Sequence, residues 1–309
     1  YKFNHLTLHD SPWKVKRDFL FIKEVFFNGA DNHVNIFILG ATGTQLLLLS
    51  LFLYVFRAKR SDIRLVFHSE LEFFDGKKGI NKFCAKIAVK YLNLTKLIPT
   101  AVLSRHIKSN MLNISSKYSD VSVVRHPMPS FNSENFMSND SRANGDLKLA
   151  IIGLLRGDTK DLSLPSKLRE IDGVSVRAFG RKGPFVEKLE LTNKCRIVDS
   201  HYSDEWLSDC MSSIDSLLLI PKINSYKFTA LGTVSDSISL GKPLVWKHHP
   251  ALTDFESLPL ATVFNHENTA KDILLFHKKL NLDSVYRWVN DWNDKSKNEL
   301  SCFIHGGIK

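Results

Sequence analysis

Residues 220–246 read IPKINSYKFTALGTVSDSISLGKPLVW, and this stretch decides the fold. It opens at the end of an apolar run, crosses a polar loop to Gly232, and continues as an amphipathic segment that ends at Gly241. A second apolar run, LVW, closes it. Strand, loop, helix and strand in this order make one unit of a parallel sheet. Because Gly232 leaves the backbone N–H groups at the helix start uncovered, the stretch predicts a site for an anion, most often phosphate.

Apolar runs alternate with helical patterns on both sides of this stretch. We expect strands at residues 3–8, 34–39, 62–67, 100–103, 122–124, 147–152, 174–179, 195–198 and 217–220. Between and after them we expect helices, among others at residues 82–94, 164–171, 186–191 and 283–293. A segment rich in Ser, Asn and Gly separates two groups of strands. We therefore predict an α/β protein with two Rossmann-like domains facing a cleft, at residues 1–132 and 147–309. Residues 133–146 are the expected linker. Two placements stay open for the last helix: on the second domain or back on the first.

An uncharged run at residues 36–56 is long enough to raise the question of a membrane span. Gly40 and Gly43 interrupt it, so we interpret it as a strand at 34–39 followed by a buried helix at 46–56. Neither piece alone could cross a bilayer.

The net charge of +10 is unevenly distributed along the chain. Residues 1–130 carry 19 Lys and Arg against 9 Asp and Glu, whereas the remainder carries 23 of each. A basic first half favours an anionic partner, such as lipid headgroups, nucleic acid or polyphosphate. The alternative is a basic surface without a partner. No recognised nucleic-acid module interleaves these basic residues with aromatic ones, so we do not expect nucleic acid.

A basic amphipathic helix is expected at residues 14–27, with Phe19, Ile22 and Phe26 among its apolar residues. Its basic residues are Lys14, Lys16, Arg17 and Lys23. This pattern predicts a face for an anionic membrane surface or a lipid-linked acceptor. The alternative is that the apolar residues face the domain core and the basic ones are merely solvated.

Four cysteines, at positions 84, 195, 210 and 302, are scattered without Cys-x-x-Cys spacing. They indicate buried thiols in a reducing compartment rather than disulfides or a metal site. No signal-peptide pattern is recognisable, so we expect a cytoplasmic protein, peripheral at the inner face of the membrane if it binds one. We expect neither a metal nor a cofactor.

Three segments of the second half carry a resemblance to a known family. They are residues 151–160 (IIGLLRGDTK), residues 196–221 and residues 232–243. In order and spacing, over about residues 147–280, they resemble GT-B glycosyltransferases of the family-4 type, also called glycosyltransferase group 1. The first segment is similar to their Gly-x-x-Arg…Lys loop, the second to their strand, turn, helix, Asp, strand and Pro segment, and the third to their donor-diphosphate helix.

The resemblance implies a site for a nucleotide-activated sugar, without an Asp-x-Asp metal motif. The donor-binding residues it implies are Gly153, Arg156, Lys160, Tyr226, Gly232, Thr233 and Asp236. A guanidinium offers a planar fork to phosphate oxygens. The alternatives are a surface Arg and Lys, a packing tyrosine, and an ordinary acid in the first turn of a helix.

Catalytic candidates are His9, His68 and Asp236, with the two histidines placed at strand ends for acceptor positioning or general-base work. A histidine at a strand end is also a common structural residue. The family usually has a Glu, seven residues and a second Glu on this helix. Counting back from Gly-Lys-Pro, the second falls on Asp236 and the first on Phe228, which has no carboxylate.

The function implied is a hexosyltransferase-type enzyme of retaining mechanism. It would move a sugar from a nucleotide-activated donor to a glycan or lipid-linked acceptor, in bacterial-type surface polysaccharide or glycolipid assembly. Two alternatives stay open: a sugar-nucleotide epimerase of the same fold, and a non-catalytic basic module that binds membrane or nucleic acid.

Overall fold

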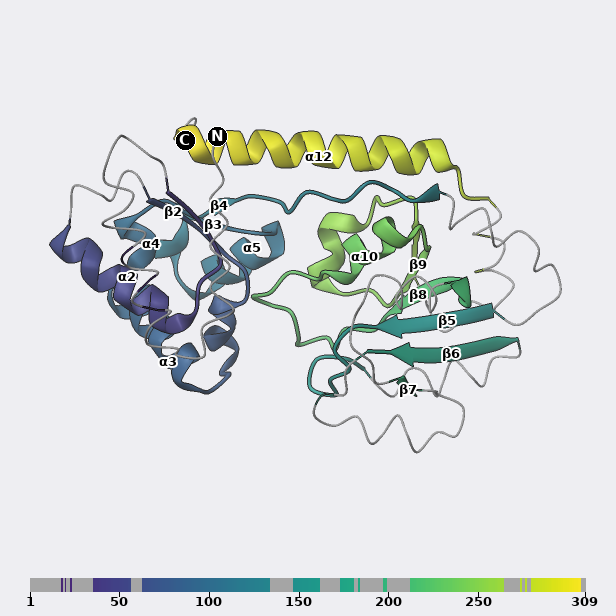
Figure 1. Cartoon of the computed structure of the whole chain (residues 1–309), viewed down its shortest axis with the longest axis horizontal. Coiled ribbons are helices and arrows are strands. Elements are labelled where there is room, and N and C mark those ends of the chain that lie inside the picture. The colour runs from purple at the N-terminus through teal and green to yellow at the C-terminus, as the bar shows by residue number, and fades with distance from the viewer. Residues whose placement is uncertain are drawn as a thin grey trace. The chain divides into compact units, whose positions relative to one another are not determined.

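The computed structural model contains two compact units (Figure 1). It describes residues 18, 20, 23, 36–56, 63–133, 147–161, 173–180, 183, 197–198, 212–263, 273, 276 and 279–306. The first unit comprises Tyr1–Arg125, Lys227–Ala230 and Asn298–Lys309, and the second comprises His126–Tyr226 and Leu231–Lys297. Of the expected linker at 133–146, only residue 133 is described. The expected strand at 3–8 and the helices expected at 164–171 and 186–191 lie outside the described residues.

The first unit holds a parallel sheet in the order β1-β2-β3-β4. Its strands are β1 (Ile36–Leu39), β2 (Ile63–Phe67), β3 (Thr100–Val102) and β4 (Ser122–Val123). β2 is buried along its whole length, which explains its continuous apolar sequence apart from Arg64. Arg64 is satisfied because its Nε donates to the carbonyl of Phe303 at 2.9 Å.

The uncharged run divides at Gly40 into β1 and α2 (Gly43–Val55), as expected from its glycines. Gly40 has φ +80°, a left-handed conformation that favours glycine. Thr42 caps α2 in a reciprocal capping box with Gln45. Among the described residues, no helix is both long and apolar enough to cross a bilayer.

Gly43 allows α2 to lie very close to α3 (Ile80–Lys86), because a Cβ there would stand 1.7 Å from the carbonyl oxygen of Asn81. The helix expected at 82–94 is present, but its helical run begins at residue 80 and ends at residue 91. α3 passes into a π-helical segment, η5 (Ile87–Tyr91), and ends before α4 (Leu94–Leu97). Asn93, with φ +50°, makes the break, since asparagine tolerates the left-handed region better than most residues.

The remaining helical elements of the first unit are η4 (Glu70–Asp75), α5 (Arg105–Ile114) and η6 (Ser116–Tyr118). They enclose a core in which Phe73, Phe74 and Tyr118 lie in ring contact. This core gives the first unit its own apolar interior.

The second unit holds a parallel sheet in the order β10-β9-β8-β5-β6-β7. Its strands are β5 (Leu147–Ile152), β6 (Val174–Phe179), β7 (Ile197–Val198), β8 (Ser216–Leu219), β9 (Leu244–Trp246) and β10 (Ala261–Val263). The chain adds β6 and β7 on one side of β5, then returns to the other side for β8. The direction of strand order therefore reverses between β5 and β8, as in dinucleotide-binding sheets.

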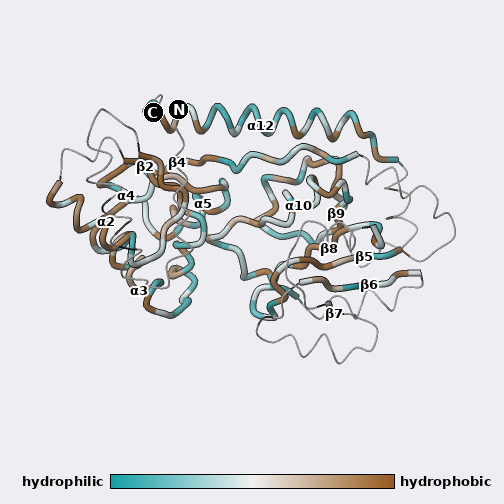
Figure 2. Tube along the Cα trace, in the orientation of Figure 1, coloured by the Kyte–Doolittle hydropathy of each residue, from teal (hydrophilic) through white to brown (hydrophobic). Residues whose placement is uncertain are grey.

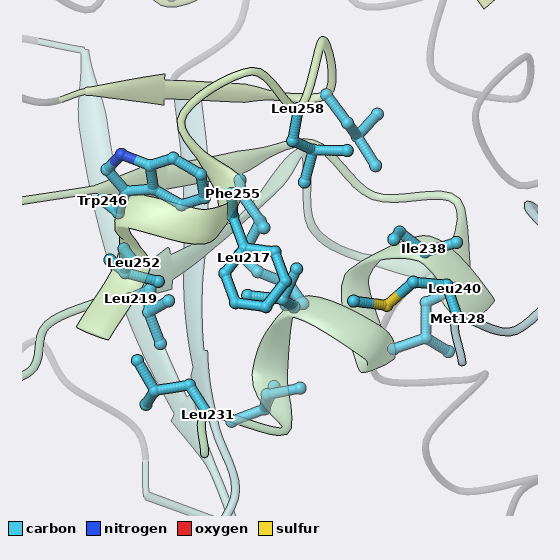
Figure 3. Packing of buried hydrophobic residues seen from close by; sticks show 14 of the residues in the cluster. Met128, Leu217, Leu219, Leu231, Ile238, Leu240, Trp246, Leu252, Phe255 and Leu258 are labelled. Carbon is cyan, nitrogen blue, oxygen red and sulfur yellow. The ribbon is translucent and has the colours of Figure 1, made fainter. Parts of the chain in front are cut away.

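One face of this sheet packs on α10 (Thr233–Leu240) and on η7 (Pro250–Phe255). Figure 3 shows the core that results, with Leu217 and Leu219 from β8 and Trp246 from β9 beside Phe255. The apolar positions of the 220–246 stretch from Leu231 to Trp246 are thus core positions, whereas Ile223 in the polar loop is 66% exposed.

The last helix, α12 (Leu282–His305), is longer than the expected 283–293. Val285, Val289 and Trp292 pack in the core of the second unit. Phe303 packs with Val66 in the first unit. Apolar side chains near both ends explain why the polar sequence between them continues as helix.

Candidate functional site

The candidate site of the second unit lies where strand order reverses. Two loops meet there, residues 153–161 after β5 and residues 220–232 after β8, at the carboxyl ends of adjacent strands. The crevice at such a reversal is the usual ligand site of an open parallel sheet.

Backbone hydrogen bonds interlock the two loops. The N–H of Asp161 donates to the carbonyl of Ile220 at 2.7 Å, and the N–H of Lys222 donates to that of Thr159 at 2.9 Å. The hydroxyl of Ser225 also donates to Thr159, at 3.0 Å. The two loops therefore form one rigid edge rather than two independent segments.

Gly153 turns the chain out of β5 with φ +94°, which favours glycine. Its N–H donates to the carbonyl of Phe179 at 3.1 Å. The role of Gly153 is to start the loop that carries Arg156 and Lys160.

Arg156 is held from two sides. Its Nε donates to Oδ1 of Asp158 at 2.9 Å, and its Nη2 lies 2.5 Å from Oδ2, so the carboxylate grips the guanidinium fork. Gly183 packs on its stem, where a Cβ would stand 2.6 Å from Cγ of Arg156. The Arg156 side chain is still 33% exposed, so an incoming anion could reach the guanidinium.

Lys160 is buried, so it is not the surface lysine of the alternative interpretation. Its Nζ donates to the carbonyl of Ile152 at 2.8 Å, at the end of β5. Burial lowers the pKa of Lys160 to about 8, and the negative charge of Asp236 opposes that shift. At neutral pH the lysine therefore holds a positive charge beside this edge of the sheet.

Asp236 lies in the first turn of α10. Surrounding protein raises the pKa of its carboxyl by desolvation, and Lys160 opposes the shift, although the side chain stays open to solvent. The two residues are thus electrostatic partners from separate elements, a relation that spacing in the sequence does not show.

The N-terminus of α10 is open. Gly232 occupies the cap position with φ −72°, and no side chain caps the helix. A Cβ at Gly232 would meet nothing within 4 Å, so glycine is required there neither by backbone conformation nor by packing. What glycine leaves in place is free space in front of the N–H groups of the first turn, which begins at Thr233.

Tyr226 has φ +55°, a conformation that is rare for an aromatic residue. It lies in the second of the interlocked loops and packs in part against the core of the second unit. Such backbone strain is often concentrated at binding sites.

Sequence reasoning missed the residues that support this edge. Nε2 of His249 lies 2.9 Å from the carbonyl of Lys222, and Nδ1 accepts the N–H of Ala251 at 3.1 Å. Because Nδ1 accepts, Nε2 carries the proton and donates to Lys222. The Nζ of Lys222 in turn donates to the carbonyl of Gly157. A His-His pair after a strand gave no sign of this brace.

In the first unit, His68 and Glu70 lie at the carboxyl end of β2. Glu70 accepts the N–H of His68 at 2.6 Å and the N–H of Ala41 at 2.8 Å. Gly40 fits beside both, because a Cβ there would stand 3.3 Å from the Glu70 carboxylate. Glu70 thus ties together the loops that follow β1 and β2, and it presents His68 at this edge.

Phe228 lies in the core of the first unit, 4% exposed. Its ring centre is 5.1 Å from that of Phe74, and the carbonyl of Lys227 next to it accepts from Asn110 at 2.8 Å. The position at which the family resemblance implies a first Glu is thus an apolar core residue of the first unit.

The structure brings the donor-binding candidates together on one unit: Gly153, Arg156, Lys160, Tyr226, Gly232, Thr233 and Asp236 all belong to the second. His68 belongs to the first unit. His9, Lys14, Lys16 and Arg17 lie outside the described residues, whereas Lys23 is helical and exposed. Among the described residues, no cluster of three or more His, Cys, Asp or Glu is arranged to hold a metal ion.

The sequence matches no protein-family model, and no curated protein is significantly similar to it. Solved structures are similar in fold. An α,α-trehalose-phosphate synthase (UDP-forming) from Burkholderia vietnamiensis superposes with a TM-score of 0.59 at 10% identity, over 94% of this chain and 76% of that one. Anabaena HepE in complex with UDP gives 0.56 at 10% identity, over 93% and 80%.

The lipopolysaccharide outer core galactosyltransferase WaaB gives a TM-score of 0.55 at 13% identity, over 85% of this chain and 80% of that one. At such identities the likeness concerns the fold. Two parallel α/β sheets on separate units, the second with its strand order reversed between β5 and β8, agree with it. The chain therefore has the fold of the GT-B glycosyltransferases.

Proposed function

We propose that the protein is a glycosyltransferase whose nucleotide-activated sugar donor binds at the strand-order reversal of the second unit. The observation that carries this proposal is the union of three positive features on one rigid edge. Arg156 and Lys160 come from one loop, and the uncapped N-terminus of α10 follows the other.

This arrangement suits the chemistry of glycosyl transfer. The leaving nucleoside diphosphate gains negative charge in the transition state, which donors and cations fixed in advance stabilise. The fork of Arg156 matches phosphate oxygens, and the first-turn N–H groups of α10 add a helix dipole. For the sugar, we propose that the carboxyl of Asp236 accepts hydrogen bonds from hydroxyls of the donor.

The donor we propose to test first is a sugar activated with UDP. HepE was solved with UDP and with UDP-glucose, and the trehalose-phosphate synthase is described as UDP-forming. The acceptor we propose is a glycan or a lipid-linked sugar, handled by the basic first unit with His68 at its strand edge and His9 as the further candidate. We propose hexosyl transfer with retention, carried out without a carboxylate at position 228.

The test is calorimetric titration with UDP, GDP and dTDP, followed by product analysis with the matching nucleotide sugars. We expect one diphosphate to bind, and transfer of the sugar to an added acceptor. No binding of any of the three would remove the proposal. Release of an epimerised sugar instead of a transferred one would assign the site to an epimerase.

A further inference from the structure

Apolar side chains are exposed in the C-terminal half of α2, and the helix has no charged residue beside them. Tyr54 and Phe56 are open to solvent, and Val55 is 75% exposed. A helix at the surface of a globular unit normally turns charged residues outward, whereas α2 contains none. Figure 2 shows α2 as a largely hydrophobic segment of the first unit.

This apolar surface continues onto the neighbouring element. The hydroxyl of Tyr54 donates to the carbonyl of Leu92 at 3.2 Å, which joins the end of α2 to the end of η5. Tyr91, the last residue of η5, is 62% exposed. We call Leu51, Tyr54, Val55, Phe56 and Tyr91 the aromatic patch.

Lysines gather beside the aromatic patch. The Nζ of Lys117 donates to the carbonyl of Lys90 at 3.0 Å, which places both lysines next to Tyr91. Burial lowers the pKa of Lys117, and the nearby charges of Lys90 and Lys96 lower it further. We call Lys90, Lys96 and Lys117 the basic rim. In the sequence, Arg57, Lys59 and Arg60 follow α2 directly.

We propose that the aromatic patch and the basic rim form a docking face for a bilayer that contains anionic lipid. Aromatic and aliphatic side chains enter the headgroup region, where tyrosine is favoured because it has an apolar ring and a polar tip. The lysines attract acidic headgroups, and their stems can cover apolar surface. This inference rests on the proposed function in one respect, because a lipid-linked acceptor would bring the enzyme to a membrane.

Charge decides against the other occupants. A second copy of this chain meeting the patch face to face would bring its own three lysines against these three, which is unfavourable. A nucleic acid would satisfy the lysines, but it would leave the aliphatic Val55 and Leu51 without an apolar partner. An anionic bilayer satisfies both kinds of side chain.

The experiment is co-sedimentation with vesicles of phosphatidylcholine alone or mixed with phosphatidylglycerol. We expect the wild type to bind the mixed vesicles at low salt, to leave them at high salt, and to ignore the neutral ones. Val55→Asp with Tyr91→Asp removes the apolar contact, and Lys90→Gln with Lys96→Gln reduces the rim. Each pair should lower the partition coefficient at least tenfold. Lys295→Gln with Lys297→Gln, on the exposed side of α12, is the matched control and should bind as the wild type does.

Thermal unfolding and UDP titration accompany every variant. Variants that fold and bind UDP but no longer bind vesicles support the docking face. Vesicle binding of both double variants at the wild-type level would overturn it. It would also be overturned if the wild type bound no vesicles and Val55→Asp with Tyr91→Asp converted a wild-type dimer to a monomer. If the wild type itself does not bind UDP, the result would count against the donor site and not against the docking face.

Discussion

At the scale of single residues, the basic groups of the proposed donor site already interact with acidic ones. Arg156 is gripped by Asp158, and Lys160 faces the charge of Asp236. A phosphate group must therefore compete with carboxylates that are already in place. Changing Asp158 and changing Arg156 should consequently act in opposite directions on phosphate binding.

The Arg156–Asp158 pair gives the first prediction. Arg156→Ala should weaken binding of the nucleoside diphosphate by about 1.5–3 kcal/mol, the range for hydrogen bonds to charged groups. Asp158→Asn should strengthen binding, because the guanidinium is released at almost unchanged shape. Calorimetry measures both, with Arg287→Ala on the exposed side of α12 as control. A parallel loss in Arg156→Ala and Asp158→Asn would show that the pair is structural.

The second prediction uses Asp236 to distinguish binding of the sugar from binding of the nucleotide. If its carboxyl accepts hydrogen bonds from donor-sugar hydroxyls, Asp236→Ala should weaken the nucleotide sugar more than the bare diphosphate. Competition titrations of the two ligands give the difference directly. Equal losses would leave Asp236 with only its electrostatic role toward Lys160.

The third prediction concerns His249 and the pH dependence of stability. Burial lowers the pKa of His249 below its ordinary 6.5, and its backbone hydrogen bonds only partly oppose this. The unfolded chain therefore binds the proton more readily, so the stability from this residue is complete above about pH 6.5 and declines as the pH falls toward the lowered value. Urea unfolding from pH 5 to 8 should show less acid-side decline in His249→Asn. The exposed neighbour, His248→Asn, should keep the decline of the wild type.

At the scale of elements, apolar patterning predicted most of the described strands because continuous buried runs have few other interpretations. It placed the end of the helix expected at 82–94 too late, because the helical run finishes with a π-helical segment before the left-handed Asn93. It also ended α12 too early, because Phe303 finds its partners far away in the sequence. The interlocking of the two site loops rests on backbone groups, which every residue carries, so no side-chain pattern could reveal it.

Phe228 gives the prediction at this scale. Phe228→Ala should lower the free energy of unfolding by about 3–5 kcal/mol, as for other buried phenylalanines. Phe228→Glu, which introduces the carboxylate that the family resemblance implies at this position, should cost at least as much because it buries a charge. Phe83→Glu, at a position 59% exposed, should stay within about 0.5 kcal/mol of the wild type. A stable Phe228→Glu protein with faster sugar transfer would mean that position 228 faces the donor.

At the scale of the whole molecule, the excess of positive charge in residues 1–130 should govern association with surfaces. The basic helix expected at 14–27 is a second element for this, beside the docking face of α2 and η5. Neutralising Lys14, Lys16, Arg17 and Lys23 to Gln together should weaken low-salt binding to anionic vesicles, at about 1 kcal/mol for each charge near the surface. Calorimetric binding of the nucleotide should be unchanged. Undiminished vesicle binding would remove this helix from the interaction and leave the α2 face alone.

The first unit is completed late in synthesis. Its core takes Phe228 from a segment near the middle of the second half, and Phe303 from the end of the last helix. Domains generally fold in the order in which they leave the ribosome. Here the unit that emerges first must wait as a nascent chain with part of its apolar surface uncovered, while the second unit is still being translated. An amino-terminal half expressed alone, ending at residue 132, would keep that surface uncovered for good and would be a substrate for chaperones rather than a functional domain.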